Sequence, residues 1–167
     1  MAVRVRASTD LERLCDLVRL VHAADGYPVF LQDDVCSFIV TDNCLAAWVC
    51  ELDSAVVGHV ALHTVWSDEV AHLAASSLRR PRNTLASVSR LFVDPARRRH
   101  GVGAQLLEVA TREAHDRALW PVLDVVTTYA AAVALYERLG WTRLGTIALP
   151  MPDGRLIDEH VYAAPEP

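Results

Sequence analysis

The spacing of apolar residues along the chain alternates between two periods, and each period predicts one kind of element. Alternating or unbroken apolar runs, which are typical of β-strands, cover residues 3–6, 46–52, 56–63, 87–93, 121–126, 141–149 and 157–163. Apolar residues spaced three and four apart, which are typical of amphipathic helices, cover residues 11–22, 32–40, 102–117 and 128–139. The order β-α-α-β-β-β-α-β-α-β-β therefore predicts one α/β (α+β) domain over residues 1–167, with helices flanking a mixed central sheet.

Capping and turn residues set the expected ends of the helices. Residues 8–10 (Ser-Thr-Asp) offer an N-cap for the first helix, and the sequence Asp-Gly-Tyr-Pro at 25–28 ends it. Thr127 or Thr128 is expected to cap the last helix, and Gly140 is expected to be its C-cap.

Residues 91–107 combine the end of an apolar strand, a short basic loop and the start of a helix. Asp94-Pro95 breaks the strand, because proline donates no ladder hydrogen bond. Gly101 and Gly103 permit close backbone approach, and the N–H groups of a first helical turn have no partners inside the helix. With the helix dipole and the three arginines at 97–99, these N–H groups would bind an anion such as phosphate. An ordinary turn with solvated arginines explains the same residues, and both interpretations stay open at this point.

The composition describes an ordinary globular protein, with 52% hydrophobic and 22% charged residues. A formal net charge of −5 argues against general nucleic-acid binding, which usually needs a basic surface. No apolar stretch approaches the length of a membrane span, and no signal-peptide pattern is visible. We therefore expect a cytoplasmic protein with no nucleic-acid or membrane partner, and a homodimer is left open.

The four cysteines, Cys15, Cys36, Cys44 and Cys50, form no Cys-x-x-Cys pair. No histidine stands near them at zinc-ligand spacing, so no metal site is expected. The sequence predicts reduced, mostly buried thiols, which is the default for a protein of a reducing compartment.

Two motifs in this order resemble those of the GCN5-related N-acetyltransferase (GNAT) superfamily. The first comprises Val93-Asp94-Pro95, then Arg98-x-x-Gly101-x-Gly103 and the Leu106-Leu107 helix. The second is Ala132-x-x-Leu135-Tyr136-Glu137-x-x-Gly140-Trp141. The order of strands and helices extends the resemblance over essentially the whole chain. It implies the GNAT fold and an acetyl-CoA-dependent N-acetyltransferase.

The resemblance implies acetyl-CoA as the co-substrate and a primary amine as the acceptor. Backbone N–H groups of the basic loop would hold the pyrophosphate, and the strand at 91–93 would splay from that at 122–126 to admit pantetheine. A backbone N–H near Phe92 or Val93 would polarise the thioester carbonyl. Tyr129 stands where many relatives have an asparagine that contacts pantetheine. The implied acetyl-CoA-binding residues are Leu91, Phe92, Val93, Arg98, Arg99, His100, Gly101, Val102, Gly103, Ala104 and Tyr129.

The resemblance also implies that Tyr136 is catalytic and protonates the departing CoA thiolate, because a phenol with a pKa of ~10 is a suitable acid. A tyrosine on an apolar helix face otherwise packs in a core, and that alternative stays open. The strand before the loop offers Ser87, Ser89 and Arg90 where several relatives have a glutamate base. The candidate bases elsewhere are Glu51, His59, His63, Asp124, Glu159 and His160. A chain of waters is an equal alternative to all of them.

The acceptor side would be built by the first two helices and by the connection over residues 64–86, whose middle has a helical pattern. Aromatic Tyr27, Phe30 and Trp66 are candidates to line an acceptor pocket. The absence of an obvious base leaves an alternative function, a GNAT-fold module that binds acyl-CoA as a sensor without turnover. A Rossmann-type nucleotide site is disfavoured, because no Gly-x-Gly-x-x-Gly follows the first strand.

Overall fold

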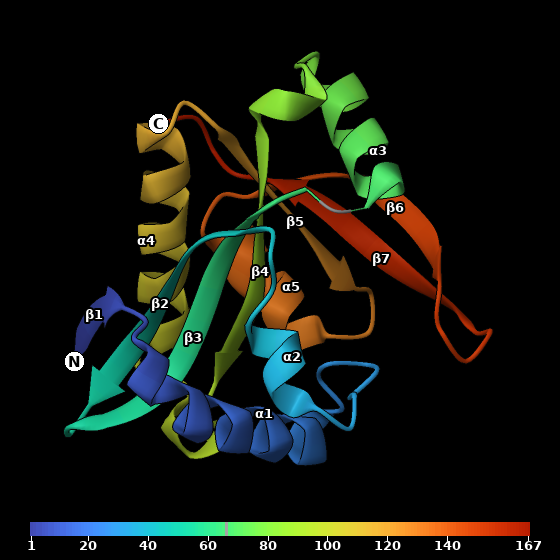
Figure 1. The fold of residues 1–167 in the computed structure, drawn as a ribbon. Helices are drawn as coiled ribbons and strands as arrows, with labels where there is room; N and C mark the ends of the chain where they lie inside the picture. The colour runs from blue at the N-terminus through green and yellow to red at the C-terminus, as the bar shows by residue number, and fades with distance from the viewer. Residues whose placement is uncertain (66) are drawn as a thin grey trace. The chain divides into compact units, whose positions relative to one another are not determined.

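The computed structural model describes residues 1–65 and 67–167 and contains seven strands and five α-helices (Figure 1). The strands are β1 (Ala2–Val5), β2 (Cys44–Leu52), β3 (Ala55–Thr64), β4 (Leu85–Val93), β5 (Trp120–Val126), β6 (Thr142–Pro150) and β7 (Leu156–Ala163). The helices are α1 (Leu11–Asp25), α2 (Val35–Ile39), α3 (Asp68–Leu78), α4 (Val102–Asp116) and α5 (Ala130–Arg138). The predicted order is confirmed with α3 added, at the helical pattern of the long connection. None of the described helices is long and apolar enough to cross a membrane.

The strands are hydrogen-bonded in the order β1-β2-β3-β4-β5-β7-β6. β4 and β5 are parallel, whereas β1 with β2, β5 with β7 and β6 with β7 are antiparallel. The predicted fold class, a mixed sheet flanked by helices, is therefore confirmed.

The contacts within the chain group it into two compact units. Unit 1 comprises Met1–Leu62 and Arg90–Ala110, and unit 2 comprises His63–Ser89 and Thr111–Pro167. The strands β3 and β4 and the helix α4 each contribute residues to both units. A single domain over residues 1–167 stays a prediction, and the two units are described separately below.

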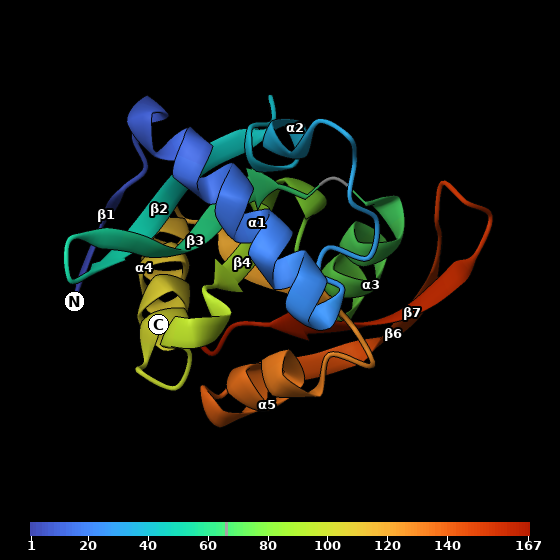
Figure 2. The same cartoon turned by 90° about the horizontal axis from the view of Figure 1, so that it is seen from below.

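In unit 1, the apolar face of α1 packs on strands β2 and β3 (Figure 2). Leu14, Leu17 and Val18 of α1 are fully buried in one cluster with Val49 and Phe92. The apolar spacing of α1 places these side chains on one stripe of the helix, as the sequence predicts. Burial of such a stripe is the main source of stability for a helix of this length.

In unit 2, helix α3 packs on strands β6 and β7, and α5 contributes Tyr136 to a cluster of aromatic rings. Ala74 of α3 is buried with Leu85, Val122 and Ala163. Strands β6 and β7 form a long hairpin (Figure 1). Its turn contains Gly154 with φ of 83°, in agreement with the predicted turn.

Of the two predicted N-caps, the first is confirmed in position and the second is wrong. Asp10 is the N-cap of α1, but its carboxylate makes no capping hydrogen bond there, because it accepts hydrogen bonds from Ala7 N at 2.7 Å and from Arg4 at 2.8 Å. The N-cap of α5 is Tyr129, which makes no side-chain cap, rather than Thr127 or Thr128. At Asp10 a neighbouring contact outweighs the local preference for a capping hydrogen bond.

Three helix ends depend on local backbone geometry. Gly26 ends α1 in the left-handed conformation, with φ of 71°, as predicted. The C-cap of α5 is Leu139, one position before the predicted Gly140, which follows it with φ of 81°. The helix expected at 32–40 is confined to α2, because the Asp34 carboxylate caps it by accepting from Cys36 N at 3.1 Å.

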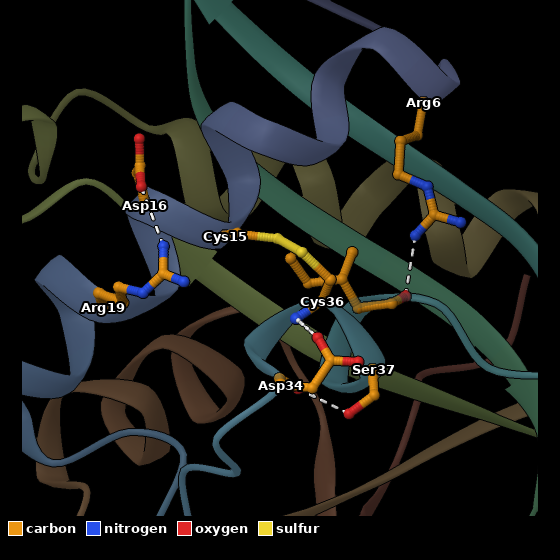
Figure 3. Close-up of a disulfide and its surroundings, with 8 residues drawn as sticks. Arg6, Cys15, Asp16, Arg19, Asp34, Cys36 and Ser37 are labelled. Carbon is orange, nitrogen blue, oxygen red and sulfur yellow. Dashed lines mark hydrogen bonds and ion pairs between the residues drawn. A yellow bond between two sulfur atoms is a disulfide. The ribbon is translucent and has the colours of Figure 1, made fainter.

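The prediction of reduced thiols is wrong for two of the four cysteines. Cys15 of α1 and Cys36 of α2 form a disulfide with a Cα–Cα distance of 5.6 Å (Figure 3). The separation of 21 residues hides this pair in the sequence, and packing of α1 against α2 brings the two side chains together. Cys44 and Cys50 are free thiols. Because disulfides are rare in reducing compartments, the thiols no longer support a cytoplasmic location, which stays a prediction.

Candidate functional site

The basic loop before α4 lies in unit 1 and has the geometry of an anion site. Residues 96–101 are exposed, and Arg99 and Gly101 both adopt left-handed backbone conformations with φ of 67° and 79°. Gln105 N donates to Gly101 O at 3.1 Å, so the N–H groups of residues 102–104 precede the first i−4 bond of α4. A Cβ atom at Gly101 would meet no atom within 4 Å, which leaves open space beside the loop. These N–H groups can therefore serve an anion at the positive end of the helix dipole.

The three arginines of the loop have different surroundings. Arg98 forms an ion pair with Asp25 at 2.9 Å, and Arg97 forms one with Asp53 at 3.4 Å. Both are therefore partly neutralised by carboxylates of unit 1. Arg99 is exposed and has no ion pair with any described residue, so its guanidinium is the one that can turn to an anion without losing a salt bridge.

Gly58 of β3 permits the start of α4 to lie against the strand. A Cβ atom at this position would lie 2.9 Å from Val102 Cγ1, 3.0 Å from Leu106 Cδ1 and 3.2 Å from Phe92 O. A glycine inside an apolar strand pattern signals such a close approach, and it is the signal that could have found this residue in the sequence. The missing side chain at Gly58 thus lets the first turn of α4, and with it the preceding anion loop, lie close to β3.

Replacing Gly58 by alanine is expected to lower the free energy of unfolding by about 2 kcal/mol, because the added methyl overlaps two side chains and a backbone carbonyl. Gly145→Ala is the matched control, since its Cβ atom would meet the flexible Leu73 Cδ2 at 3.0 Å and no backbone. It is expected to cost less than about 1 kcal/mol. Urea unfolding of both variants measures the difference, and equal losses would contradict the close approach at Gly58.

Strand β4 carries an irregularity at Arg90, just before the three predicted residues Leu91, Phe92 and Val93. Arg90 has φ of 53°, and its carbonyl lies 3.0 Å from His59 Nδ1. Its guanidinium donates to Phe38 O of α2 and lies over the Phe38 ring. A left-handed residue within a strand is typical of a β-bulge, which re-aims the following backbone groups. The sequence does not reveal this left-handed residue, because arginine has no preference for such a conformation.

His59 is fully buried, and its environment fits a structural role. Its ring stacks on Phe92 at 5.1 Å, and Arg6 Nη1 lies 3.4 Å from its Nε2. An arginine donates only, so Nε2 accepts and Nδ1 carries the proton given to the Arg90 carbonyl. This tautomer leaves His59 no basic nitrogen for a substrate.

In unit 2, Tyr136 of α5 is 7% exposed and lies among other aromatic rings. The ring centroids of Trp141 and Tyr162 lie 6.2 and 6.0 Å from it. Burial, and next the charge of Asp124, raise the pKa of the Tyr136 phenol above its usual value. The phenol is therefore protonated throughout the neutral range, as a proton donor must be. Tyr129 stands at the N-cap of α5, seven residues earlier in the same unit.

The pairing of β4 with β5 is short, and the splay of residues 91–93 from residues 122–126 stays a prediction. The two strands are paired over Leu85–Ser87 and Trp120–Val122, within unit 2, and no further pair between them is found in the described chain. Residues 123–126 of β5 pair instead with β7 on the other side.

Two carboxyl groups of the candidate bases lie together in unit 2. Asp124 is on β5 and Glu159 is on the adjacent strand β7, where it pairs with Val126. Glu159 is 8% exposed, and its burial, followed by the charge and hydrogen bond of Asp124, raises its pKa to about 8. A carboxyl group in this state can exchange a proton near neutral pH.

The other candidate bases are engaged elsewhere. Glu51 forms an ion pair with Arg4 at 2.6 Å. His160 Nδ1 lies 2.8 Å from Thr146 Oγ1, and His63 Nδ1 lies 2.8 Å from Ser89 Oγ. The structure therefore distinguishes six candidates that the sequence leaves equal.

The aromatic residues expected on the acceptor side are only partly placed there. Tyr27 packs against Phe38 in the core of unit 1, with ring centroids 5.9 Å apart, whereas Phe30 is 41% exposed. Trp66 lies outside the described residues. Phe30 thus remains available to an acceptor, and Tyr27 supports the α1–α2 packing.

Comparison with protein families and curated proteins identifies related sequences. The model of the Acetyltransferase (GNAT) family matches residues 11–141 of the chain. A mycothiol acetyltransferase from Catenulispora acidiphila is 48% identical over 52 residues, which are 30% of this chain. That match spans only 17% of the length of the mycothiol enzyme.

Solved structures with the same fold cover almost the entire chain. A ribosomal-protein-alanine N-acetyltransferase from Brucella melitensis superposes with a TM-score of 0.72 at 18% identity, covering 98% of both chains. NAA60 from Arabidopsis thaliana, in complex with acetyl-CoA, also has a TM-score of 0.72 at 18% identity, covering 97% of this chain and 96% of its own. At such low identity these likenesses show the fold alone.

Proposed function

Because this chain belongs to the acetyltransferase (GNAT) family, we propose that it transfers an acetyl group from acetyl-CoA to a primary amine of a small molecule or protein. The observation that carries the proposal is the exposed loop before α4, whose glycine geometry frees a set of backbone N–H groups. Both family motifs noted in the sequence fall within the matched residues 11–141, so the predicted family is confirmed.

The proposed acetyl-CoA site uses backbone more than side chains. The pyrophosphate would accept hydrogen bonds from the N–H groups at residues 98–104, while Arg99 adds a positive charge. Leu91, Phe92 and Val93 follow Arg90, whose left-handed conformation is typical of a bulge that would re-aim their backbone groups. One of their N–H groups would polarise the thioester carbonyl, and Tyr129 would pack against the pantetheine arm.

In the proposed reaction, the lone pair of the neutral amine attacks the thioester carbonyl carbon directly. The C–N bond forms, the C–S bond breaks, and the electron pair leaves on the CoA sulfur. Tyr136 then donates its phenolic proton to this thiolate. The high pKa of the buried phenol keeps that proton in place until the thiolate forms.

The names of related proteins support the co-substrate but not a particular acceptor. Acetyl-CoA is bound to NAA60, and the Catenulispora enzyme is called a mycothiol acetyltransferase. Both fit acetyl transfer, and neither name identifies the acceptor of this chain. We therefore leave the acceptor as a primary amine.

The reaction is tested by measuring CoA release from acetyl-CoA with a panel of primary amines. The panel comprises an alkyl diamine, an arylethylamine, an aminoglycoside and a peptide with a free α-amino group. Release above the rate without amine, together with an N-acetylated product in the mass spectrum, is the expected result. Binding of acetyl-CoA without release for every amine would favour the alternative function, an acyl-CoA sensor.

The loop geometry predicts a selective loss of acetyl-CoA binding in Gly101→Val. Valine is strained at φ of 79°, and the cost of about 1–2 kcal/mol comes from the backbone, because a Cβ atom meets no neighbour there. Gly154→Val is the matched control, with φ of 83° and equally open space, in the β6–β7 turn.

Both variants are expected to lose similar stability, but only Gly101→Val should lose the rise in melting temperature that millimolar acetyl-CoA gives the wild type. Differential scanning fluorimetry with and without acetyl-CoA measures both effects. An unchanged ligand-induced shift in Gly101→Val would place the pyrophosphate elsewhere.

A further inference from the structure

Polar side chains form a row on one face of the sheet in unit 2. Ser87 pairs with Val122, and Val126 pairs with Glu159, so these four residues share a face. Since side chains alternate along a strand, Asp124 lies on that face between Val122 and Val126. The face therefore carries a serine of β4 and the two carboxyl groups of β5 and β7.

Glu159 is the carboxyl group on this face that lacks a described hydrogen-bond partner for one of its oxygens. It is 92% buried (8% exposed), and its Oε2 atom has no hydrogen-bond partner among the described residues. A buried carboxyl oxygen without a partner is costly, and native proteins usually provide one. Burial raises the pKa of Glu159, and the charge and hydrogen bond of the neighbouring Asp124 raise it further. The Glu159 oxygen without a described partner and the neighbouring carboxyl group therefore indicate a place for a polar, positively charged ligand group.

We propose that Glu159 is the general base of the acetyl transfer, accepting a proton from an acceptor that arrives as an alkylammonium ion, with Asp124 as the neighbouring carboxylate. The inference rests on the proposed function, and it deepens that function by naming the base and the charge of the acceptor. A cation is the group that two neighbouring carboxyl groups attract, since it relieves their mutual repulsion. Asp124 acts through Glu159 and is a positioning residue.

The proton balance is complete with these groups. The ammonium ion gives one proton to the Glu159 carboxylate, and the resulting neutral amine attacks the thioester. After attack the nitrogen loses a second proton to solvent, and solvent restores the phenol of Tyr136 that has protonated the thiolate. Glu159 returns its proton to solvent before the next turnover. One proton is released per amide formed.

The electrostatic surroundings agree with this role. Glu159 needs to be deprotonated to act, and its pKa of about 8 gives a substantial carboxylate fraction in mildly alkaline solution. The elements packed against β7 carry other charged groups: Asp68, Glu69 and His72 of α3, Arg143 of β6, and Glu137 and Arg138 of α5. Of the charged groups around Glu159, Asp124 is the one that adds to burial in raising its pKa.

The test compares Glu159→Gln with Asp158→Asn, an exposed carboxylate of the same strand. The substrate is the amine that gives the fastest CoA release in the panel above. In the wild type, kcat/KM should rise with pH with an inflection near 8. Glu159→Gln should lose about 100-fold in kcat/KM together with this inflection, whereas Asp158→Asn should keep both. Asp124→Asn should move the inflection to lower pH, because one negative charge is removed.

A second measurement needs no acetyl-CoA. The folded protein holds a proton on Glu159 up to pH about 8, whereas the unfolded chain releases it near 4.5. The stability that this proton confers is full below pH 4.5 and is lost as the pH rises to about 8. Glu159→Gln should therefore flatten the decline of unfolding free energy across this range, and Asp158→Asn should not.

The outcomes separate the two proposals. An amine-dependent wild type whose Glu159→Gln variant keeps its rate and pH profile overturns the base assignment and leaves acetyl transfer standing. No CoA release with any amine overturns the proposed function and this inference together. A flattened stability profile in Glu159→Gln, combined with the lost kinetic inflection, supports the assignment.

Discussion

Tyr136→Phe is expected to lower kcat by about 100-fold while the Kd for acetyl-CoA changes less than about 2-fold. The substitution removes one hydroxyl group and keeps the ring that packs between Trp141 and Tyr162. Without the phenol the departing thiolate must take its proton from water, so the loss falls on turnover rather than on binding. Steady-state CoA release and a fluorescence titration with acetyl-CoA measure the two quantities separately.

The matched control is Tyr162→Phe, which also removes a tyrosine hydroxyl from the same cluster. The Tyr162 hydroxyl donates to Glu137 at 3.0 Å, so this variant loses a hydrogen bond and about 1 kcal/mol of stability. Its kcat should stay close to that of the wild type. Equal losses of kcat in both variants would show that Tyr136 supports packing, which is the alternative left open by the sequence.

The architecture follows from periodicity because most elements here bury one face. The apolar spacing of residues 102–117 predicts α4 (Val102–Asp116) almost to the residue, and the run at 121–126 predicts β5 (Trp120–Val126). The predictions are wrong where tertiary contacts decide, as at α2, whose five residues are too few to be stable alone. Asp10 is the N-cap of α1 as predicted, but Arg4 and Ala7 N donate to the carboxylate that would otherwise accept from the first turn of α1.

In the candidate site too, the sequence predicts the features that depend on local backbone conformation and misses those that depend on tertiary contacts. Gly101 is recognisable from sequence, because its motif encodes a local backbone conformation that glycine favours. The interaction of Asp124 with Glu159 depends on the register between two strands that are more than thirty positions apart in the sequence, and no local pattern encodes that register. The sequence therefore supplies both carboxyl groups as candidates, and the sheet register selects them from the other four.

The sequence does not predict the disulfide between Cys15 and Cys36, because this bond depends on how two helices pack. Cysteine spacing identifies metal and redox motifs only when the residues are close neighbours in sequence. Cys15 and Cys36 instead meet through the packing of a long helix on a short one. A hydrogen bond from Arg6 Nη1 to Ile39 O, at 2.9 Å, further stabilises the position of α2 (Figure 3). The segment between the two cysteines, which contains Phe30, is thereby held at both ends.

Cys36→Ser is expected to lower the free energy of unfolding by about 3 kcal/mol, because opening a 21-residue separation restores conformational entropy to the unfolded chain. Cys36 is the better cysteine of the disulfide to replace, because it is exposed and tolerates serine, whereas Cys15 is buried. Cys44→Ser is the control, because Cys44 is a free thiol and its loss should leave the stability of the oxidised protein nearly unchanged.

Urea unfolding with and without a phosphine reductant gives the decisive comparison. The reductant should bring the wild type down to the stability of Cys36→Ser and should have no effect on that variant. Thiol titration of the denatured, unreduced wild type should count two thiols, Cys44 and Cys50. A count of four would mean that the bond does not form, and α2 would then be held by its buried Val35 and Ile39 together with the hydrogen bonds of Asp34, Arg6 and Arg90.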